Sequence, residues 1–167
     1  MVLKDFSWKT LIVIGLLAGL IQVATGVAMY MVGVYFEPWS IFVSMFALLL
    51  CIVFGTRWYR DFALNGQITY GQALIVGIVI SVSTGIVYAI YNVISISFIY
   101  PRFLEDLISL NLASAPVSQR TPEFLAAMRE RITANTIALS NLIRLSVFGT
   151  ILAVFASLIL KRAQKTT

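Results

Sequence analysis

The stretch RWYRDFALNGQITYGQA, residues 57–73, carries three charged residues and the turn dipeptide Asn65-Gly66 between two apolar runs. The chain has four long apolar runs, of which only the last contains a charged residue: 10–36, 39–56, 68–101 and 133–160. Each run can cross about 30 Å of hydrocarbon as a helix of about 20 residues. The stretch 57–73 is therefore predicted to join two membrane-spanning helices.

Composition favours the same class of protein. Hydrophobic residues make up 60% of the chain and charged residues 11%, and the mean hydropathy is +0.94. Charged residues make up about a quarter of a soluble domain. We predict an all-α, polytopic membrane protein: a single membrane domain over residues 1–167, with a bundle of four transmembrane helices. The expected spans are 10–35, 39–58, 70–100 and 137–160, with a cytoplasmic loop at 59–69 and a small extracytoplasmic helical segment at 101–136.

Lysine and arginine in short loops mark the cytoplasmic side of a membrane protein. Here they flank the spans at both termini and in the stretch 57–73: Lys4, Lys9, Arg57, Arg60, Lys161, Arg162 and Lys165. The loop at Glu37-Pro38 has none, and the four arginines within 102–132 are matched by four acidic residues. Both termini are therefore expected in the cytoplasm. Because the basic residues flank spans and do not form one soluble face, nucleic acid is not an expected partner.

Few residues in the chain are suited to catalysis. There is no histidine, and the one cysteine, Cys51, lies inside the second span. A histidine base, a metal site built from histidine or cysteine, and a disulfide framework are thereby excluded. The glycine-rich phosphate motifs and the G-x-S-x-G motif are also missing. We expect no enzyme activity, no metal and no cofactor.

Small residues recur every four positions along the third span. They form one ridge: Ala73, Gly77, Ser81, Gly85 and Ala89. Such a ridge lets two helix backbones approach closely. The ridge is interpreted either as packing inside the bundle or as the face of a homodimer.

The stretch 57–73 also contains a candidate cytoplasmic corner, formed by Tyr59, Arg60, Asp61 and Gln72. Thr69 and Gln72 fit a capping box at the start of the third helix. Arg60 and Asp61 either pair with each other, or hold a lipid headgroup or a partner protein.

Arg144 is the one charged residue clearly inside an apolar run. A charge at that depth is a candidate for function. Three interpretations remain open: an ion pair with Glu37, Glu105 or Asp106, a side chain that reaches the outer interface alone, or a site for an anionic ligand or headgroup.

The outer segment contains its own helix signal. Thr121-Pro122-Glu123 combines an N-cap residue, a proline at the first helical position and an acid in the first turn. The fourth helix is expected to begin here as an amphipathic section and to run straight into the membrane.

The strings YRDFALNGQITYGQALIVG (Tyr59–Gly77), GIVYAIYNVI and IYPRF resemble the bacterial four-helix membrane family catalogued as domain of unknown function (DUF) 4199. Phe62 replaces a residue that is often charged in that family. The resemblance implies a multi-pass protein of the bacterial cytoplasmic (inner) membrane, and it supplies no catalytic residues to carry over.

Two functions are consistent with these features. One is a non-enzymatic structural, partner-binding or regulatory role, in which membrane lipids and a second copy or another membrane protein are the partners. The alternative is a small transport or permeation module that acts as an oligomer, with an outer-side anionic ligand or lipid site near Arg144.

Overall fold

A computed structural model describes residues 7–100, 102–117 and 120–161. All the elements assigned within these residues are helices. The elements in chain order are α1 (Trp8–Met31), α2 (Ser40–Ala63), α3 (Tyr70–Ile94), the π-helical turn η1 (Ser95–Ile99), α4 (Phe103–Ser114), α5 (Pro122–Arg131) and α6 (Ala134–Leu160). Four helices are long and apolar enough to cross a membrane: α1, α2, α3 continued by η1, and α6. The predicted all-α membrane fold is confirmed.

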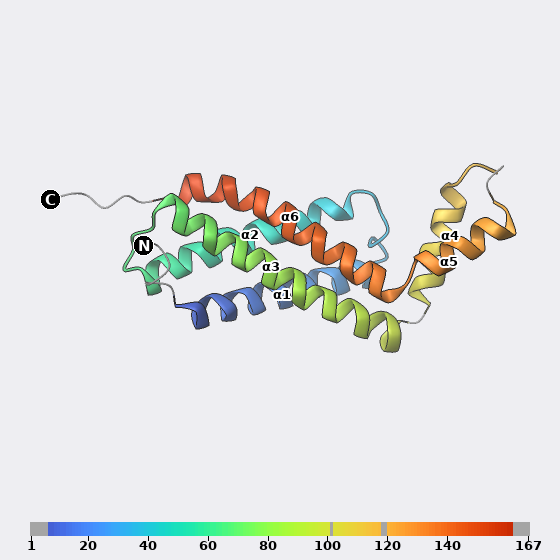
Figure 1. Ribbon diagram of the computed structural model, residues 1–167, viewed down its shortest axis with the longest axis horizontal. Helices are drawn as coiled ribbons and strands as arrows, with labels where there is room; N and C mark the ends of the chain where they lie inside the picture. The colour runs from blue at the N-terminus through green and yellow to red at the C-terminus, as the bar shows by residue number, and fades with distance from the viewer. Residues whose placement is uncertain (1–6, 101, 118–119, 162–167) are drawn as a thin grey trace. The chain divides into compact units, whose positions relative to one another are not determined.

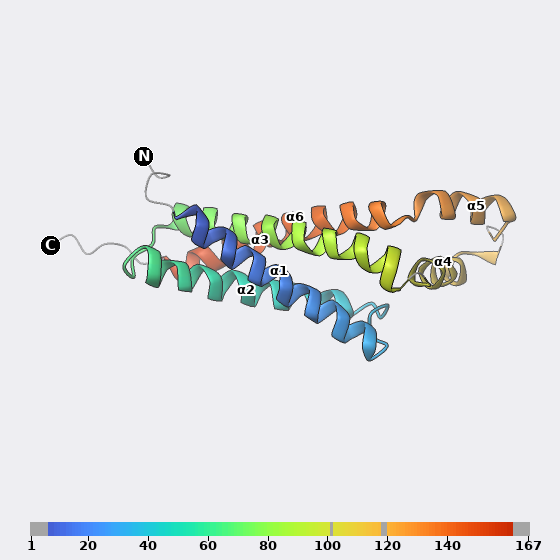
Figure 2. The ribbon, with the colours of Figure 1, turned by 90° about the horizontal axis from the view of Figure 1, so that it is seen from below.

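The chain divides into two compact units, of which the first contains Met1–Tyr88 and Leu142–Thr167. Within this unit α1, α2 and most of α3 and α6 run side by side as a four-helix bundle (Figure 1, Figure 2). The start of α1, the turn between α2 and α3, and the end of α6 lie at one end, which we call the terminal end. Fully buried residues fill the interior of the bundle: Leu11, Leu48, Ile52, Val76, Ile80 and Leu145.

Inside this unit, the small-residue ridge of α3 lies against α6. A Cβ atom at Gly77 would be 2.6 Å from the Cβ of Ala153, which is too close for any real pair of Cβ atoms. One turn further on, a Cβ at Gly149 would collide with the side chain of Ser81 in the same way. The ridge is thus used for packing within a single chain. Ala89, its last member, belongs to the second unit and is half-buried.

Two helices end at other residues than the predicted spans, whose limits in a membrane stay predictions. The first helix ends at Met31 and not near residue 35, because Gly33 takes a positive φ of 75° that no continuing helix allows. The second helix continues to Ala63 and not to residue 58, so the loop that follows is shorter than the predicted 59–69. Tyr59, Arg60 and Asp61 are therefore helical residues, held by the last turn of α2.

The second unit, Ala89–Asn141, contains η1, α4, α5 and the start of α6. The predicted helix start is present, since the Thr121 hydroxyl accepts a hydrogen bond from the Phe124 N–H at 3.2 Å. The predicted continuity of this section with the fourth span is wrong. α5 ends at Arg131, and the Thr133 hydroxyl caps α6 separately by accepting from the Thr136 N–H at 3.2 Å. A second N-cap two residues after α5 makes two helices from one expected helix.

Candidate functional site

The predicted corner lies at the terminal end, where α2 turns into α3. Asn65 and Gly66 both take positive φ values, 52° and 81°, which reverse the chain after α2. The Gly66 N–H donates to the carbonyl of Arg60 at 2.9 Å and so closes the last turn of the helix. The Asn-Gly dipeptide therefore fixes both the end of α2 and the direction in which α3 begins.

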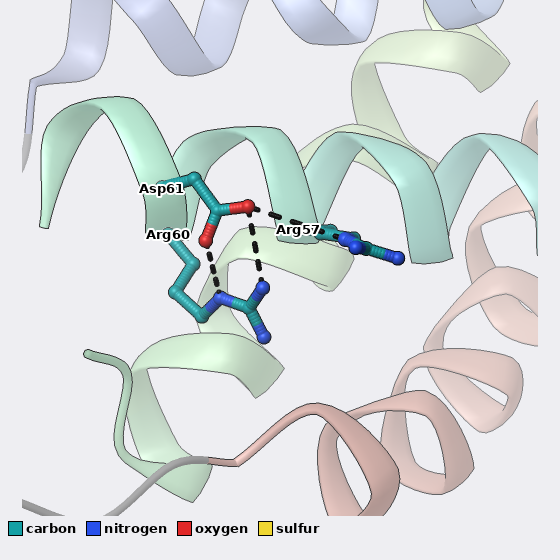
Figure 3. Close-up of polar contacts among 3 residues, drawn as sticks. All are labelled: Arg57, Arg60 and Asp61. Atoms are coloured by element: carbon teal, nitrogen blue, oxygen red, sulfur yellow. Dashed lines mark hydrogen bonds and ion pairs between the residues drawn. The ribbon is translucent and has the colours of Figure 1, made fainter. Parts of the chain in front are cut away.

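Arg60 and Asp61 pair through two contacts. The Nε of Arg60 donates to Oδ1 of Asp61 at 2.7 Å, and Nη2 donates to Oδ2 at 3.2 Å. Arg57, one turn earlier, places its Nε 4.0 Å from Oδ2 of the same carboxylate (Figure 3). Bidentate pairs of this kind are among the stronger hydrogen bonds in proteins. Of the interpretations left open by the sequence, the local pair is present.

Burial distinguishes the two arginines that share Asp61. The side chain of Arg60 is 7% exposed and that of Arg57 is 63% exposed. Arg60 extends from α2 toward α3, and one of its terminal nitrogens has no dashed line in Figure 3. Among the described residues, no acceptor for that nitrogen is present. The two guanidinium groups and one carboxylate leave this cluster with a net positive charge.

Tyr59 and Gln72, the other predicted corner residues, hold the corner in place. The Tyr59 ring is fully buried, and its hydroxyl accepts a hydrogen bond from the Ser7 N–H at 2.8 Å, which ties the start of α1 to the end of α2. Gln72 accepts from the Thr69 N–H at 3.0 Å and donates its own N–H to the Thr69 hydroxyl at 3.3 Å. This is the predicted capping box, so Gln72 fixes the first turn of α3.

Among the described residues, no contact of the candidate outer site joins Arg144 to an acid. The Nε of Arg144 is buried and has no hydrogen-bond partner among the described residues. Glu37 is exposed and makes no ion pair with Arg144 in the part of the chain that is described. Glu105 pairs with Arg129 of α5 at 3.3 Å, a partner that the sequence did not suggest. A pair between Arg144 and Asp106, or between Arg144 and Glu105, stays a prediction.

A polar contact lies in the interior of the bundle, between Gln22 and a serine that the sequence did not single out. The amide nitrogen of Gln22 in α1 donates to the hydroxyl of Ser44 in α2, and both side chains are buried. The amide oxygen of Gln22 has no partner among the described residues. Interhelical hydrogen bonds of this kind contribute about 0.6 kcal/mol in membrane proteins. Ser44 gives no sequence signal, because one serine in an apolar run has many possible roles.

We predict that Asp61 is coupled to Arg60 and hardly to Arg57. Asp61→Asn and Arg60→Gln should each destabilise the protein, and their double mutant should lose less than the sum, with a coupling of about 1 kcal/mol. The matched cycle of Asp61→Asn with Arg57→Gln should give less than about 0.5 kcal/mol, since that pair is long and exposed. Unfolding of the detergent-solubilised protein measures both cycles. Equal couplings would contradict the assignment.

Comparison with known proteins agrees with the helix layout. The family described as "Protein of unknown function (DUF4199)" matches residues 14–162, which include all four spanning helices apart from the first turns of α1. No curated protein and no solved structure matches the chain. The matched region includes the corner and the small-residue ridge. The chain belongs to the DUF4199 family of multi-pass membrane proteins.

Proposed function

We propose that this protein is a non-enzymatic component of the bacterial inner membrane, with both termini in the cytoplasm, that binds a membrane protein partner or a second copy of itself. The observation that carries the proposal is an exposed, mixed aromatic and charged surface on the last turns of α2. We call Arg57, Trp58, Asp61 and Phe62 the corner face. Residues four apart are neighbours on a helix, so these four share one side of α2.

The chemistry of the corner face supports a role in binding. Phe62 is 78% exposed, and its ring meets the ring of Trp58 edge to face with centroids 5.9 Å apart. Arg57 and Asp61 lie beside these rings and remain accessible. Aromatic residues and arginine are enriched at the centres of protein interfaces. Trp58 fits the belt of aromatic residues that is common at membrane interfaces. Phe62 lies one turn further on, in the final turn of the helix, where a protein partner explains its exposure better than lipid does.

The orientation in the membrane is supported by the distribution of charge. The described part of the terminal end carries Lys9, Arg57, Arg60 and Lys161 against Asp61 alone. Such an excess of basic residues is typical of the cytoplasmic side. The corner face would then be available to cytoplasmic segments of other membrane proteins.

A second candidate function is supported by Arg144. A buried guanidinium nitrogen without a partner favours an anionic ligand or lipid, as expected of a transport or permeation module that acts as an oligomer. We rank this function second, because it rests on one buried nitrogen.

The proposed orientation predicts which sites an impermeant thiol reagent can reach. In a chain with Cys51 replaced by serine, Gln67→Cys should be protected in intact spheroplasts and labelled after lysis, while Glu37→Cys should be labelled in both. Gln67 and Glu37 are both exposed, so access depends on the side of the membrane. Labelling of position 67 from outside would overturn the orientation.

Partner binding predicts a position-dependent photocrosslink. A photoreactive residue at position 62 should give one or a few products of discrete mass in intact membranes, including the doubled mass if the partner is a second copy. Position 54 is the matched control, since Phe54 is 62% exposed on the same helix but lies within the span. Arg57→Gln with Asp61→Asn should reduce the yield at position 62 by more than about half. Absence of discrete products at 62, or the same products at 54, would refute the proposal.

A further inference from the structure

A cleft of about 410 Å³ opens at the terminal end between the start of α3 and the end of α6. Its described lining consists of Ile68, Thr69 and Tyr70 on one side and Lys161 on the other. All four residues belong to the same compact unit, the four-helix bundle. The volume lies within the range of about 300–1,000 Å³ that is usual for small-ligand sites. None of these residues has a role in the corner face.

The lining combines an apolar floor with a cation. Ile68 is almost fully buried, whereas Tyr70 is 37% exposed and Lys161 is exposed. No ion pair engages Lys161 within the described residues. A cation beside apolar and aromatic surface matches a ligand that has one anionic end and one apolar end.

Backbone donors lie next to the cleft. The capping box uses the N–H groups of Thr69 and Gln72, while those of Tyr70 and Gly71 have no acceptor among the described residues. Apart from the adjoining backbone, no atom of the described residues lies within 4 Å of the place where a Cβ of Gly71 would be. The first turn of α3 is therefore open to close approach. Free N–H groups at a helix start favour an anion, and here they lie beside a lysine.

The position of the cleft in the membrane identifies the ligand class. α3 begins at Tyr70 and α6 ends at Leu160, and both are spanning helices. The ends of spanning helices are expected at the level of the lipid headgroups, where phosphate and acyl chain meet. A small soluble anion would make no favourable contact with the apolar floor of the cleft. We propose that this cleft binds an anionic phospholipid, with its phosphate against Lys161 and the first turn of α3 and an acyl chain along Ile68 and Tyr70.

This inference rests on the membrane assignment and not on partner binding at the corner face. A lipid held between the start of α3 and the end of α6 would clamp the two helices that carry the small-residue interface. It would therefore stabilise the folded bundle in proportion to its occupancy. Failure of the photocrosslink at position 62 would leave the lipid site untouched, and loss of the lipid site would leave the corner face untouched.

The test compares lipids and variants of the full chain in a neutral detergent. Phosphatidylglycerol should raise the Tm more than phosphatidylcholine does, and native mass spectrometry should retain one phosphatidylglycerol per chain. Lys161→Gln should weaken the apparent affinity about tenfold, as expected when one charge-assisted contact is lost. Lys9→Gln is the matched control, because it removes the same charge from an exposed position at the same end.

A second variant keeps Lys161 and blocks the approach of a ligand to the backbone N–H groups in the first turn of α3. Gly71→Leu places a side chain in the open space beside the first turn, so it should keep the lipid-free Tm while losing the response to phosphatidylglycerol. Arg144→Met should keep the response, which separates this cleft from the candidate outer site.

Several results would overturn the proposal. Equal responses to the two lipids, or equal losses in Lys161→Gln and Lys9→Gln, would mean that no specific site exists. An equal Tm shift with inorganic phosphate alone would identify a soluble anion as the ligand. Loss of the response in Arg144→Met with retention in Lys161→Gln would move the lipid to the other site.

Discussion

The bundle depends on the close approach of α3 and α6. Inside a membrane, apolar side chains gain little by leaving lipid for one another, so helices associate where small residues let their backbones come near. Gly77 meets Ala153 and Gly149 meets Ser81 at distances that leave no room for a Cβ atom, and Gly85 lies close to Leu142. The glycines of α1 repeat this arrangement on another side of α3, where Gly19 lies against Val87. α3 is consequently the central packing element of the bundle.

This packing determines what the terminal end can display. Because α3 is held against α6, its first turn lies across the cleft from Lys161, and the capping box keeps that turn in a fixed conformation. α2 is tied to the start of α1 through Tyr59 and ends in a turn that only positive-φ residues can make. Arg60 is buried there and pairs with Asp61, whose side chain is 43% exposed. Helix packing thereby supports two separate surfaces at one end, the corner face and the cleft.

Sequence reasoning succeeded where local chemistry decides the structure. The capping box at Thr69, the Asn65-Gly66 turn and the Thr121 cap each follow from residues close in the chain. It failed where two weak local signals compete. Thr133 starts a new helix although the apolar pattern continues through it, because its hydroxyl offers the next turn a cap. Likewise, no pattern could choose between Arg129 and Arg144 as the partner of Glu105, since the choice depends on how α4 and α5 meet.

The candidate site was predictable only in part for the same reason. The sequence identified four corner residues as a group: Tyr59, Arg60, Asp61 and Gln72. In the structure Arg60 pairs with Asp61, Tyr59 binds the start of α1, and Gln72 caps α3. The cleft could not be predicted, because Lys161 and Tyr70 are far apart in the chain and meet only through the packing of α3 on α6. The sequence did not decide whether the small-residue ridge packs inside the bundle or forms a homodimer face. A periodic pattern shows that a helix packs closely, but it does not identify the partner helix.

The most direct test of this account compares alanine at two glycines of α3. Gly77→Ala would force α3 and α6 apart, and overpacking of this kind costs about 1–3 kcal/mol, so the Tm of the solubilised protein should fall by several degrees. Gly71→Ala meets nothing within 4 Å and should leave the Tm unchanged or slightly raised. Equal melting temperatures for the two variants would contradict the claim that the close approach of α3 and α6 holds the bundle together.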